Sequence, residues 1–225
     1  MELKNPLYKN IGVHVIISLF TIDNGNIKVL LIKRKNNPYN GMWALVGGAL
    51  YNNEELLDGM KREIKEKTGI EDINIYFSSV IGDLDRSPLQ RMIAISYIGI
   101  IDSKRVNILK DTMKTSDADW VDIDKVTTLA YDHNKILDES IKTLRKRIIE
   151  TDILKSLYPE GFTIPEIQKV YETILNTKYD RRNFRKKLLS LGLIVDTNKY
   201  QNFEGKKPAK LYKFDEKFNI NKNVF

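Results

Sequence analysis

The segment Gly48–Ile70 constrains the fold of this chain most, because glycines and charged residues recur in it at fixed distances. It reads GALYNNEELLDGMKREIKEKTGI. Apolar side chains recur at three- and four-residue steps over Leu56–Ile64, which predicts a helix with one apolar face. The asparagines Asn52–Asn53 are typical of a helix start, and Gly69 is typical of a helix end. We therefore expect a helix bounded by glycines, with Glu54 in its first turn.

The charged residues of this helix predict a site for phosphate chemistry. Glu63, Glu66 and Lys67 lie at i, i+3 and i+4, so their side chains share one face. Carboxylates on one face, with Glu54 upstream, form the oxygen-rich site that Mg²⁺ prefers, and such a metal would polarise a pyrophosphate. The Lys67 ammonium opposes this, because it repels a cation, is spaced to pair with Glu63 and can itself bind a phosphate. Ordinary surface charge on a solvated helix is the alternative interpretation.

The segment resembles the Nudix box, G-x5-E-x7-R-E-U-x-E-E-x-G-U, where U is aliphatic. Lys67 is the one departure, since it stands where the pattern has a second consecutive Glu. The resemblance implies an α/β/α sandwich and, in an active hydrolase, Mg²⁺ with Glu63 and Glu66 as catalytic metal ligands. Because of Lys67 we expect the fold without hydrolysis and with no required cofactor. The matching positions are Gly48, Glu54, Arg62, Glu63, Ile64, Glu66, Gly69 and Ile70.

Two further segments are expected to contact a ligand. The double glycine Gly47–Gly48 lets the backbone approach a bound molecule closely, although a tight turn explains it equally well. Residues 82–91 resemble a loop of the ADP-ribose-related Nudix branch, which implies that Arg86 and Arg91 bind a pyrophosphate or ribose phosphate. Solvated loop arginines are the alternative. The predicted ligand-binding residues are Gly47, Gly48, Glu54, Arg62, Lys67, Arg86 and Arg91.

The rest of the first 150 residues alternates strand patterns with one more helix. Val13–Thr21 and Lys28–Lys33 predict a hairpin around the turn at residues 23–26. His133, at the start of the helix, is more typical of a packing or capping residue than of a catalytic base. Further strands are expected over residues 73–81, 91–101 and 119–121, and a helix over 134–149.

Composition excludes some chemistry and places the charge. The chain of 225 residues has no cysteine and two histidines, which excludes disulfides and cysteine-based zinc sites or nucleophiles. Its last 65 residues contain 14 Lys and Arg and 7 Asp and Glu, and so carry the whole net charge of +7. Such a distribution indicates a polyanionic partner for a second domain. The apolar run at residues 11–20 is too short to span a membrane, so we expect a buried strand, no membrane partner and a cytoplasmic protein.

The basic C-terminal part, residues 151–225, has the pattern of a winged helix-turn-helix. Thr163 and Glu166 form a capping-box pattern before one helix, and Asp180 is the expected N-cap of a second, basic helix. Strands over 193–195 and 211–214 would form a wing, joined by a loop that holds Lys199 and other lysines. A basic helical cap that binds nothing is the alternative. The predicted DNA-binding residues are Arg181, Arg182, Asn183, Arg185, Lys186, Lys206, Lys207 and Lys210.

With both parts together, nearly the whole chain resembles the Nudix-related transcriptional regulators of the NrtR and AraR type. The resemblance implies an α+β chain with a Nudix effector-binding domain (1–150) and a winged-helix DNA-binding domain (151–225). It also implies a homodimer, double-stranded DNA as partner and a small effector, either an ADP-ribose-like nucleotide or a sugar. A Mg²⁺-dependent ADP-ribose pyrophosphatase with an appended winged helix is the alternative. The sequence leaves open the effector, the operator and whether the protein represses or activates.

Overall fold

The computed structural model describes residues 11–203 and 206–215 and divides into two compact units. The first consists of residues up to Thr21 together with Lys28–Ile141, and the second of Ile22–Ile27 with the residues from Lys142 onward. This division falls inside a helix, whereas the boundary predicted from the sequence lies between residues 150 and 151 and stays a prediction. Within the described ranges, no helix is long and apolar enough to cross a membrane.

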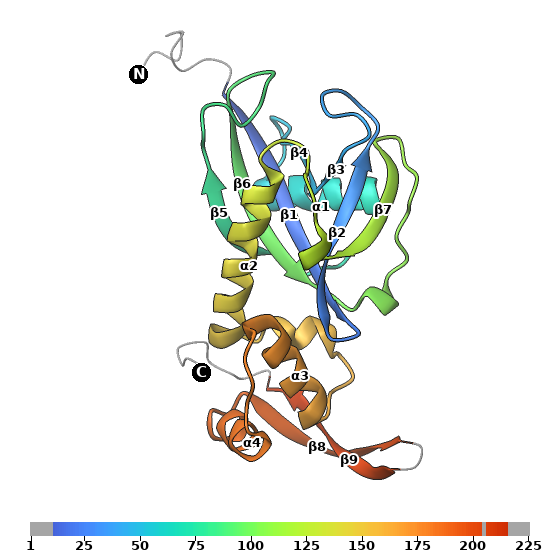
Figure 1. Cartoon of the computed structure of the whole chain (residues 1–225), viewed down its shortest axis with the longest axis vertical. Helices are drawn as coiled ribbons and strands as arrows, with labels where there is room; N and C mark the ends of the chain where they lie inside the picture. The colour runs from blue at the N-terminus through green and yellow to red at the C-terminus, as the bar shows by residue number, and fades with distance from the viewer. Residues whose placement is uncertain (1–10, 204–205, 216–225) are drawn as a thin grey trace. The chain divides into compact units, whose positions relative to one another are not determined.

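The first unit is built on a seven-stranded sheet in the order β3-β2-β1-β6-β5, with β4 paired to β1 and β7 paired to β2 (Figure 1). β1 and β6 are parallel, and the pairs β1–β4, β2–β3, β2–β7 and β5–β6 are antiparallel. The predicted hairpin joins β1 to β2 through Asn24 and Gly25, both with positive φ. The strands are β1 (Gly12–Asp23), β2 (Asn26–Arg34), β3 (Trp43–Ala44), β4 (Val46–Ala49), β5 (Tyr76–Ile81), β6 (Met92–Ile100) and β7 (Thr115–Asp122).

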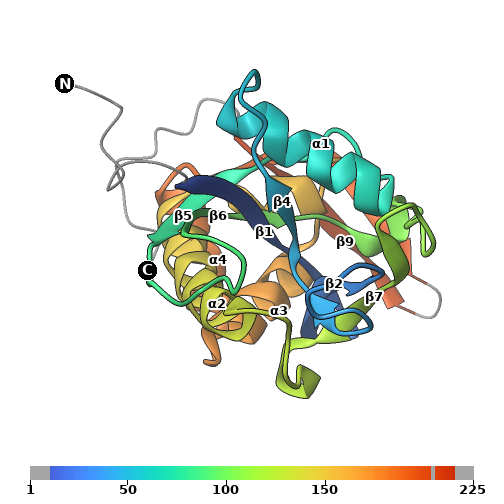
Figure 2. The same cartoon turned by 90° about the horizontal axis from the view of Figure 1, so that it is seen from above.

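Alternation along β1 separates the two faces of this sheet. Val15 and Ile17 join the core that contains Met60 of helix α1 (Leu56–Thr68). Ser18 has the opposite parity and shares a hydrogen bond of 2.9 Å with Ser140 of helix α2 (His133–Glu150). Figures 1 and 2 show α1 and the start of α2 on opposite faces of the sheet. The predicted α/β/α sandwich is therefore confirmed.

The second unit is a winged helix. Helix α3 (Ile164–Leu175) begins with the predicted capping box, in which the Thr163 N–H donates to Glu166 at 2.7 Å. Helix α4 (Arg181–Ser190) is capped by Asp180, which accepts the Asn183 N–H at 2.9 Å. Strands β8 (Ile194–Phe203) and β9 (Lys206–Phe214) form the wing, and Phe162 forms a β-bridge with Tyr212.

The strands of the wing are longer than the sequence predicted. The prediction that the lysines lie in the loop between them is therefore wrong. Lys199 lies in β8, and Lys206, Lys207 and Lys210 lie in β9. The ladder continues outward through pairs such as Tyr200 with Lys210. Backbone hydrogen bonds extend the strands where side chains face solvent, so the apolar pattern ends before the strands do.

Candidate functional site

The Nudix-box helix starts later than its sequence predicted. α1 begins at Leu56 with Glu55 as N-cap, so Glu54 lies before the helix and not in its first turn. The Glu54 carboxylate instead accepts the Tyr51 N–H at 2.7 Å and forms two hydrogen bonds with Arg62, of 2.6 and 2.8 Å. The hydrogen bonds with Arg62 hold the Glu54 side chain against the helix while its backbone stays outside the helix. The bonds from Arg62 lower the pKa of Glu54 to about 2, so this carboxylate is charged at neutral pH.

Glu63 is the buried centre of this charged site. Its Oε1 lies 2.6 Å from Arg62 Nη1, and its Oε2 lies 2.8 Å from Lys67 Nζ. Burial opposes the charge on Glu63, but the Lys67 ammonium and the bonds from Lys67 and Arg62 outweigh it and lower the pKa of the carboxyl. Lys67 is also buried and donates to the Gly47 carbonyl. The pairing with Glu63 expected from the sequence is therefore present, and Lys67 ties the helix to β4.

A further lysine, which the sequence analysis missed, completes the set of charges. Lys114 Nζ lies 2.9 Å from Glu66 Oε2 and 3.9 Å from Glu63 Oε1, and Arg62 lies 3.6 Å from Glu66. Lys114 precedes β7, far from the box in sequence, and only the sheet topology brings it close. The three carboxylates of Glu54, Glu63 and Glu66 thus face the three cations of Arg62, Lys67 and Lys114.

This arrangement does not fit a divalent metal. A Mg²⁺ site needs carboxylate oxygens that are free to coordinate, and here Glu63 and Glu66 already pair with ammonium and guanidinium groups. No group of three or more His, Asp or Glu side chains suited to a metal ion occurs in the part of the chain that the structure describes. The predicted metal ligands therefore lie together, but they act as partners of protein cations.

The double glycine lets α1 and the sheet approach closely. A Cβ at Gly47 would lie 2.5 Å from the Val15 carbonyl oxygen, and one at Gly48 would lie 2.2 Å from the Glu63 carboxylate. Neither contact is sterically allowed, because the first partner is backbone of the central strand and the second is held by Lys67. The glycines thus set the distance between β4 and the charged side chains.

We expect Gly47→Ala to destabilise the protein by about 1–3 kcal/mol, the usual cost of forcing extra volume into a packed site. The measurement is the urea dependence of unfolding. Gly82→Ala is the matched control, because a Cβ there would meet only the end of the Arg91 side chain at 3.8 Å. Equal stability of the two variants would contradict the close-packing role of Gly47.

A small cationic cavity lies beside this charged cluster. Its volume is about 80 Å³, and Lys67, Lys114 and Arg34 contribute three positive charges to its lining. Arg34 donates to the Pro38 carbonyl at 3.1 Å and lies over the Tyr131 ring, 5.0 Å from its centroid. Glu63 and Glu66 pair with the two lysines, so Arg34 leaves the lining with a net positive charge, which favours an anion such as a phosphate group. Neither Arg34 nor Tyr131 belongs to a sequence motif that would have identified it.

The two loop arginines lie in different surroundings. Arg86 is buried and donates to both oxygens of Asp132, at 3.0 and 3.1 Å. Arg91 donates to the carbonyls of Gly82 and Asp83, each at 2.6 Å. Arg86 therefore ties the loop to the residue before α2, whereas Arg91 braces the loop internally. The predicted contact of both arginines with a pyrophosphate stays a prediction.

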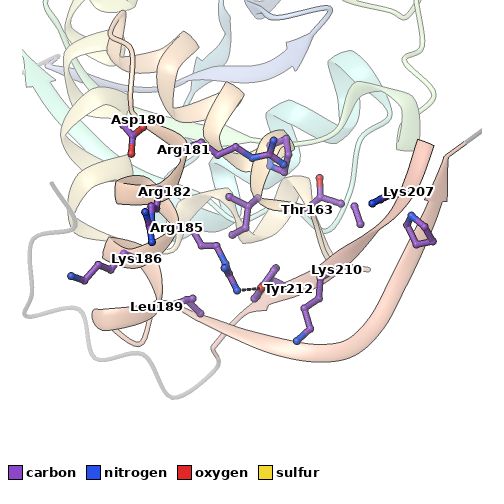
Figure 3. A pocket seen from close by; sticks show the side chains of 14 residues that line it. Thr163, Asp180, Arg181, Arg182, Arg185, Lys186, Leu189, Lys207, Lys210 and Tyr212 are labelled. Atoms are coloured by element: carbon purple, nitrogen blue, oxygen red, sulfur yellow. Dashed lines mark hydrogen bonds between the residues drawn. The ribbon is translucent and has the colours of Figure 1, made fainter. Parts of the chain in front are cut away.

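The second candidate site is the cationic groove of the winged helix, between α3, α4 and β9. Its volume is about 950 Å³. Figure 3 shows the side chains that line it. Arg185 Nη2 and the Tyr212 hydroxyl are 3.3 Å apart, which joins α4 to the wing. Lys210 pairs with Asp196 of β8, so its charge is partly compensated. The basic lining residues are Arg181, Arg182, Arg185, Lys186, Lys207 and Lys210.

Two predicted DNA contacts are not among the described residues that line this groove. Asn183 belongs to α4 and its backbone N–H completes the helix cap, but its side chain is not among the groove residues. Lys206 begins β9, and its side chain lies outside the described part of the structure. The sequence analysis did not identify Tyr212 as a groove residue. Only 3 % of its surface is exposed, as in a core aromatic, but its hydroxyl contacts Arg185.

The fold and the two sites define a Nudix domain joined to a DNA-binding winged helix, and comparison with known proteins agrees. The sequence model of the NUDIX domain family matches residues 12–144. The sequence model of the NrtR DNA-binding winged helix domain matches residues 155–214. The chain belongs to the NrtR group of the Nudix family, as the resemblance predicted.

Individual relatives extend over most of the chain. The ADPR responsive transcriptional repressor NtrR of Acinetobacter baylyi is 30% identical over 202 residues, which cover 88% of this chain and 80% of the relative. Shewanella oneidensis NrtR in complex with a 27mer DNA has a TM-score of 0.75 at 25% identity and covers 90% of this chain and 93% of that one. The NUDIX domain of the same Shewanella protein, complexed with ADP ribose, has a TM-score of 0.57 at 25% identity and covers 63% of this chain and 93% of its own.

Proposed function

We propose that this chain is a transcriptional repressor that binds double-stranded DNA through its winged helix and releases it when ADP-ribose binds its Nudix domain. The observation that carries the proposal is the cationic groove of α4 and β9, which lies in the part of the chain with the whole net charge of +7. A groove of arginines and lysines on a winged helix suits the phosphates and base edges of a duplex. The Acinetobacter relative supports repression as the direction.

On the DNA side, α4 is the recognition helix. Its arginines would enter the major groove, while Lys207 of the wing contacts phosphates. Winged-helix regulators that read two half-sites do so as symmetric dimers, and we include a homodimer in the proposal on this ground. A regulator of this kind acts where the DNA is, which supports the expected cytoplasmic location.

On the effector side, the charge of the small cavity favours a nucleotide over a neutral sugar. Arg34, Lys67 and Lys114 line this cavity. Although Glu63 and Glu66 pair with the two lysines, a phosphate group can add ionic hydrogen bonds to these cations, whereas a sugar without phosphate has no charge to offer them. The ADP ribose complex of the Shewanella NUDIX domain supports the same class of ligand. We therefore propose ADP-ribose, bound without a metal ion.

Hydrolysis is the less supported function. Nudix hydrolases use Mg²⁺, and the acids that would hold it here are paired with Arg62, Lys67 and Lys114. A phosphate bound by the cavity cations Arg34, Lys67 and Lys114 would be held without a metal to polarise it or to activate an attacking water. We propose that the domain senses its ligand without cleaving it.

The test is a binding experiment on duplexes selected by the protein from a random-sequence pool. We expect ADP-ribose to weaken binding of the selected duplex, and the duplex to weaken ADP-ribose binding by the same factor, as linkage requires. The logarithm of the affinity should fall with the logarithm of the salt concentration by roughly 0.9 per phosphate contact. Selection of no sequence, or affinity unchanged by saturating ADP-ribose, would overturn the proposal.

A further inference from the structure

The two histidines of the chain lie side by side in the structure. In the sequence they are 119 positions apart and share no motif. His14 belongs to β1 and His133 begins α2, and their ring centroids are 6.4 Å apart with the planes at 21°. The Tyr131 ring stacks on His133 at 5.5 Å, and Arg34 lies over that same tyrosine. The histidine pair therefore adjoins the residues that line the cationic cavity.

One nitrogen of each histidine is buried without a hydrogen-bond partner among the described residues: His133 Nε2 and His14 Nδ1. The other ring nitrogen of His133, Nδ1, accepts the Leu45 N–H at 3.1 Å and so carries no proton. A neutral His133 must therefore hold its proton on Nε2, which makes Nε2–H a buried donor without an acceptor. Native structures rarely leave such a group unpaired, so it points to a missing partner.

Both imidazoles are neutral at physiological pH. Burial lowers the pKa of His14 to about 3, with the positive charges of Arg86 and Lys67 adding to the effect. Burial also lowers the pKa of His133 well below its usual value. A neutral His14 with its proton on Nε2 offers Nδ1 as an acceptor. The pair then presents one donor and one acceptor, and a hydroxyl group, which both accepts and donates, satisfies them together.

We propose that a ribose hydroxyl of the effector binds between the two histidines, accepting a hydrogen bond from His133 Nε2–H and donating one to His14 Nδ1. The inference rests on the proposed function, because it assigns part of the ADP-ribose site. ADP-ribose carries ribose hydroxyls next to its phosphates, which matches the histidine pair next to the cavity of Arg34 and Lys67. Both nitrogens are buried in the free protein, although His14 as a residue has intermediate exposure. The pair would select sugar-bearing diphosphates over bare ones.

Nitrogen NMR of the full chain with ¹⁵N-labelled histidine tests this directly, because only two ring systems give signals. The free protein should show His133 as the Nε2–H tautomer. Saturating ADP-ribose should shift His133 Nε2 and His14 Nδ1 together, while inorganic pyrophosphate, which lacks a hydroxyl, should leave both in place. Ring nitrogens that do not respond to bound ADP-ribose would show that a buried water fills the space, and would overturn the inference.

A variant separates this inference from the proposed function. His14→Phe keeps an aromatic ring and the Leu45 bond to His133 but removes the acceptor. We expect ADP-ribose to bind roughly threefold to tenfold more weakly, the range for one neutral hydrogen bond, with pyrophosphate affinity and duplex binding unchanged. If His14→Phe binds ADP-ribose with wild-type affinity, the assignment of the hydroxyl to the histidine pair fails and the proposed function stands. If the wild-type protein fails to bind ADP-ribose in calorimetry, the proposed function itself fails.

Discussion

Lys67→Glu is expected to turn the charged cluster into a divalent metal site. The substitution replaces the ammonium 2.8 Å from Glu63 with a carboxylate and so changes the local charge by two units. Glu63, Glu66 and the new carboxylate would then share one helix face, the donor set that Mg²⁺ and Mn²⁺ prefer. We expect Mn²⁺ to bind with a dissociation constant on the order of 1 mM or tighter, within the range of weak carboxylate sites. Manganese electron paramagnetic resonance measures this, with wild-type protein showing no site-bound ion.

The stability of the same variant gives a second, independent reading. Removing one partner of a buried ion pair costs about 3–5 kcal/mol, and the added charge next to Glu63 makes the loss larger without metal. A metal that binds the folded state alone restores stability with its concentration. We therefore expect Lys67→Glu to melt well below wild type in EDTA and to recover in millimolar Mn²⁺. Lys67→Gln is the control, because it removes the cation without adding a ligand and should show the loss without the recovery.

Turnover decides what the lysine means for function. If Lys67→Glu binds Mn²⁺ and cleaves ADP-ribose while the wild type does not, the domain retains the geometry of a hydrolase and lacks only its metal. Cleavage by wild-type protein at a comparable rate would contradict the proposed sensor. Metal binding without cleavage would mean that catalysis also requires residues outside the box, which position the attacking water or the substrate.

The sequence predicted the fold well because its strongest signals are local. The helix-ending Gly69, the capping box at Thr163 and the N-cap Asp180 each act within a few residues, and the structure bears them out. The start of α1 was wrong, since the hydrogen bonds between Glu54 and Arg62 override the asparagines that favour an earlier start. Local propensity predicts a helix, but tertiary bonds fix where it begins.

The site was less predictable, because its decisive contacts join residues far apart in the chain. Lys114 reaches Glu66 from 48 positions away, and His133 accepts the Leu45 N–H from 88 positions away. Neither contact has a spacing that a sequence pattern can detect. Lys67 alone showed that the metal site was altered, but the full pairing of acids with cations required the sheet that brings β7 beside α1.

Arg185→Ala is expected to weaken binding of the selected duplex about tenfold to a hundredfold, the cost of about 1–3 kcal/mol for losing a base-reading arginine. Arg185 lies in the cationic groove, and the contact with the Tyr212 hydroxyl holds its guanidinium at one place between α4 and the wing. A positioned arginine can read a base, whereas a mobile one contributes charge alone. Fluorescence anisotropy with the selected duplex and with a scrambled duplex measures the specific and the non-specific terms.

Two further variants show whether position or charge matters. Lys187→Ala removes the same charge from the same helix but outside the groove, and we expect a change of less than about threefold on both duplexes, in line with loss of a single distant charge. Tyr212→Phe keeps the buried ring and the net charge and removes only the hydroxyl that contacts Arg185. Tyr212→Phe should lower the affinity for the selected duplex more than for the scrambled one, because Arg185 keeps its charge but loses the hydroxyl contact that positions it. If Arg185→Ala and Lys187→Ala weaken both duplexes equally, α4 contributes charge without reading sequence, and recognition must come from another part of the winged helix.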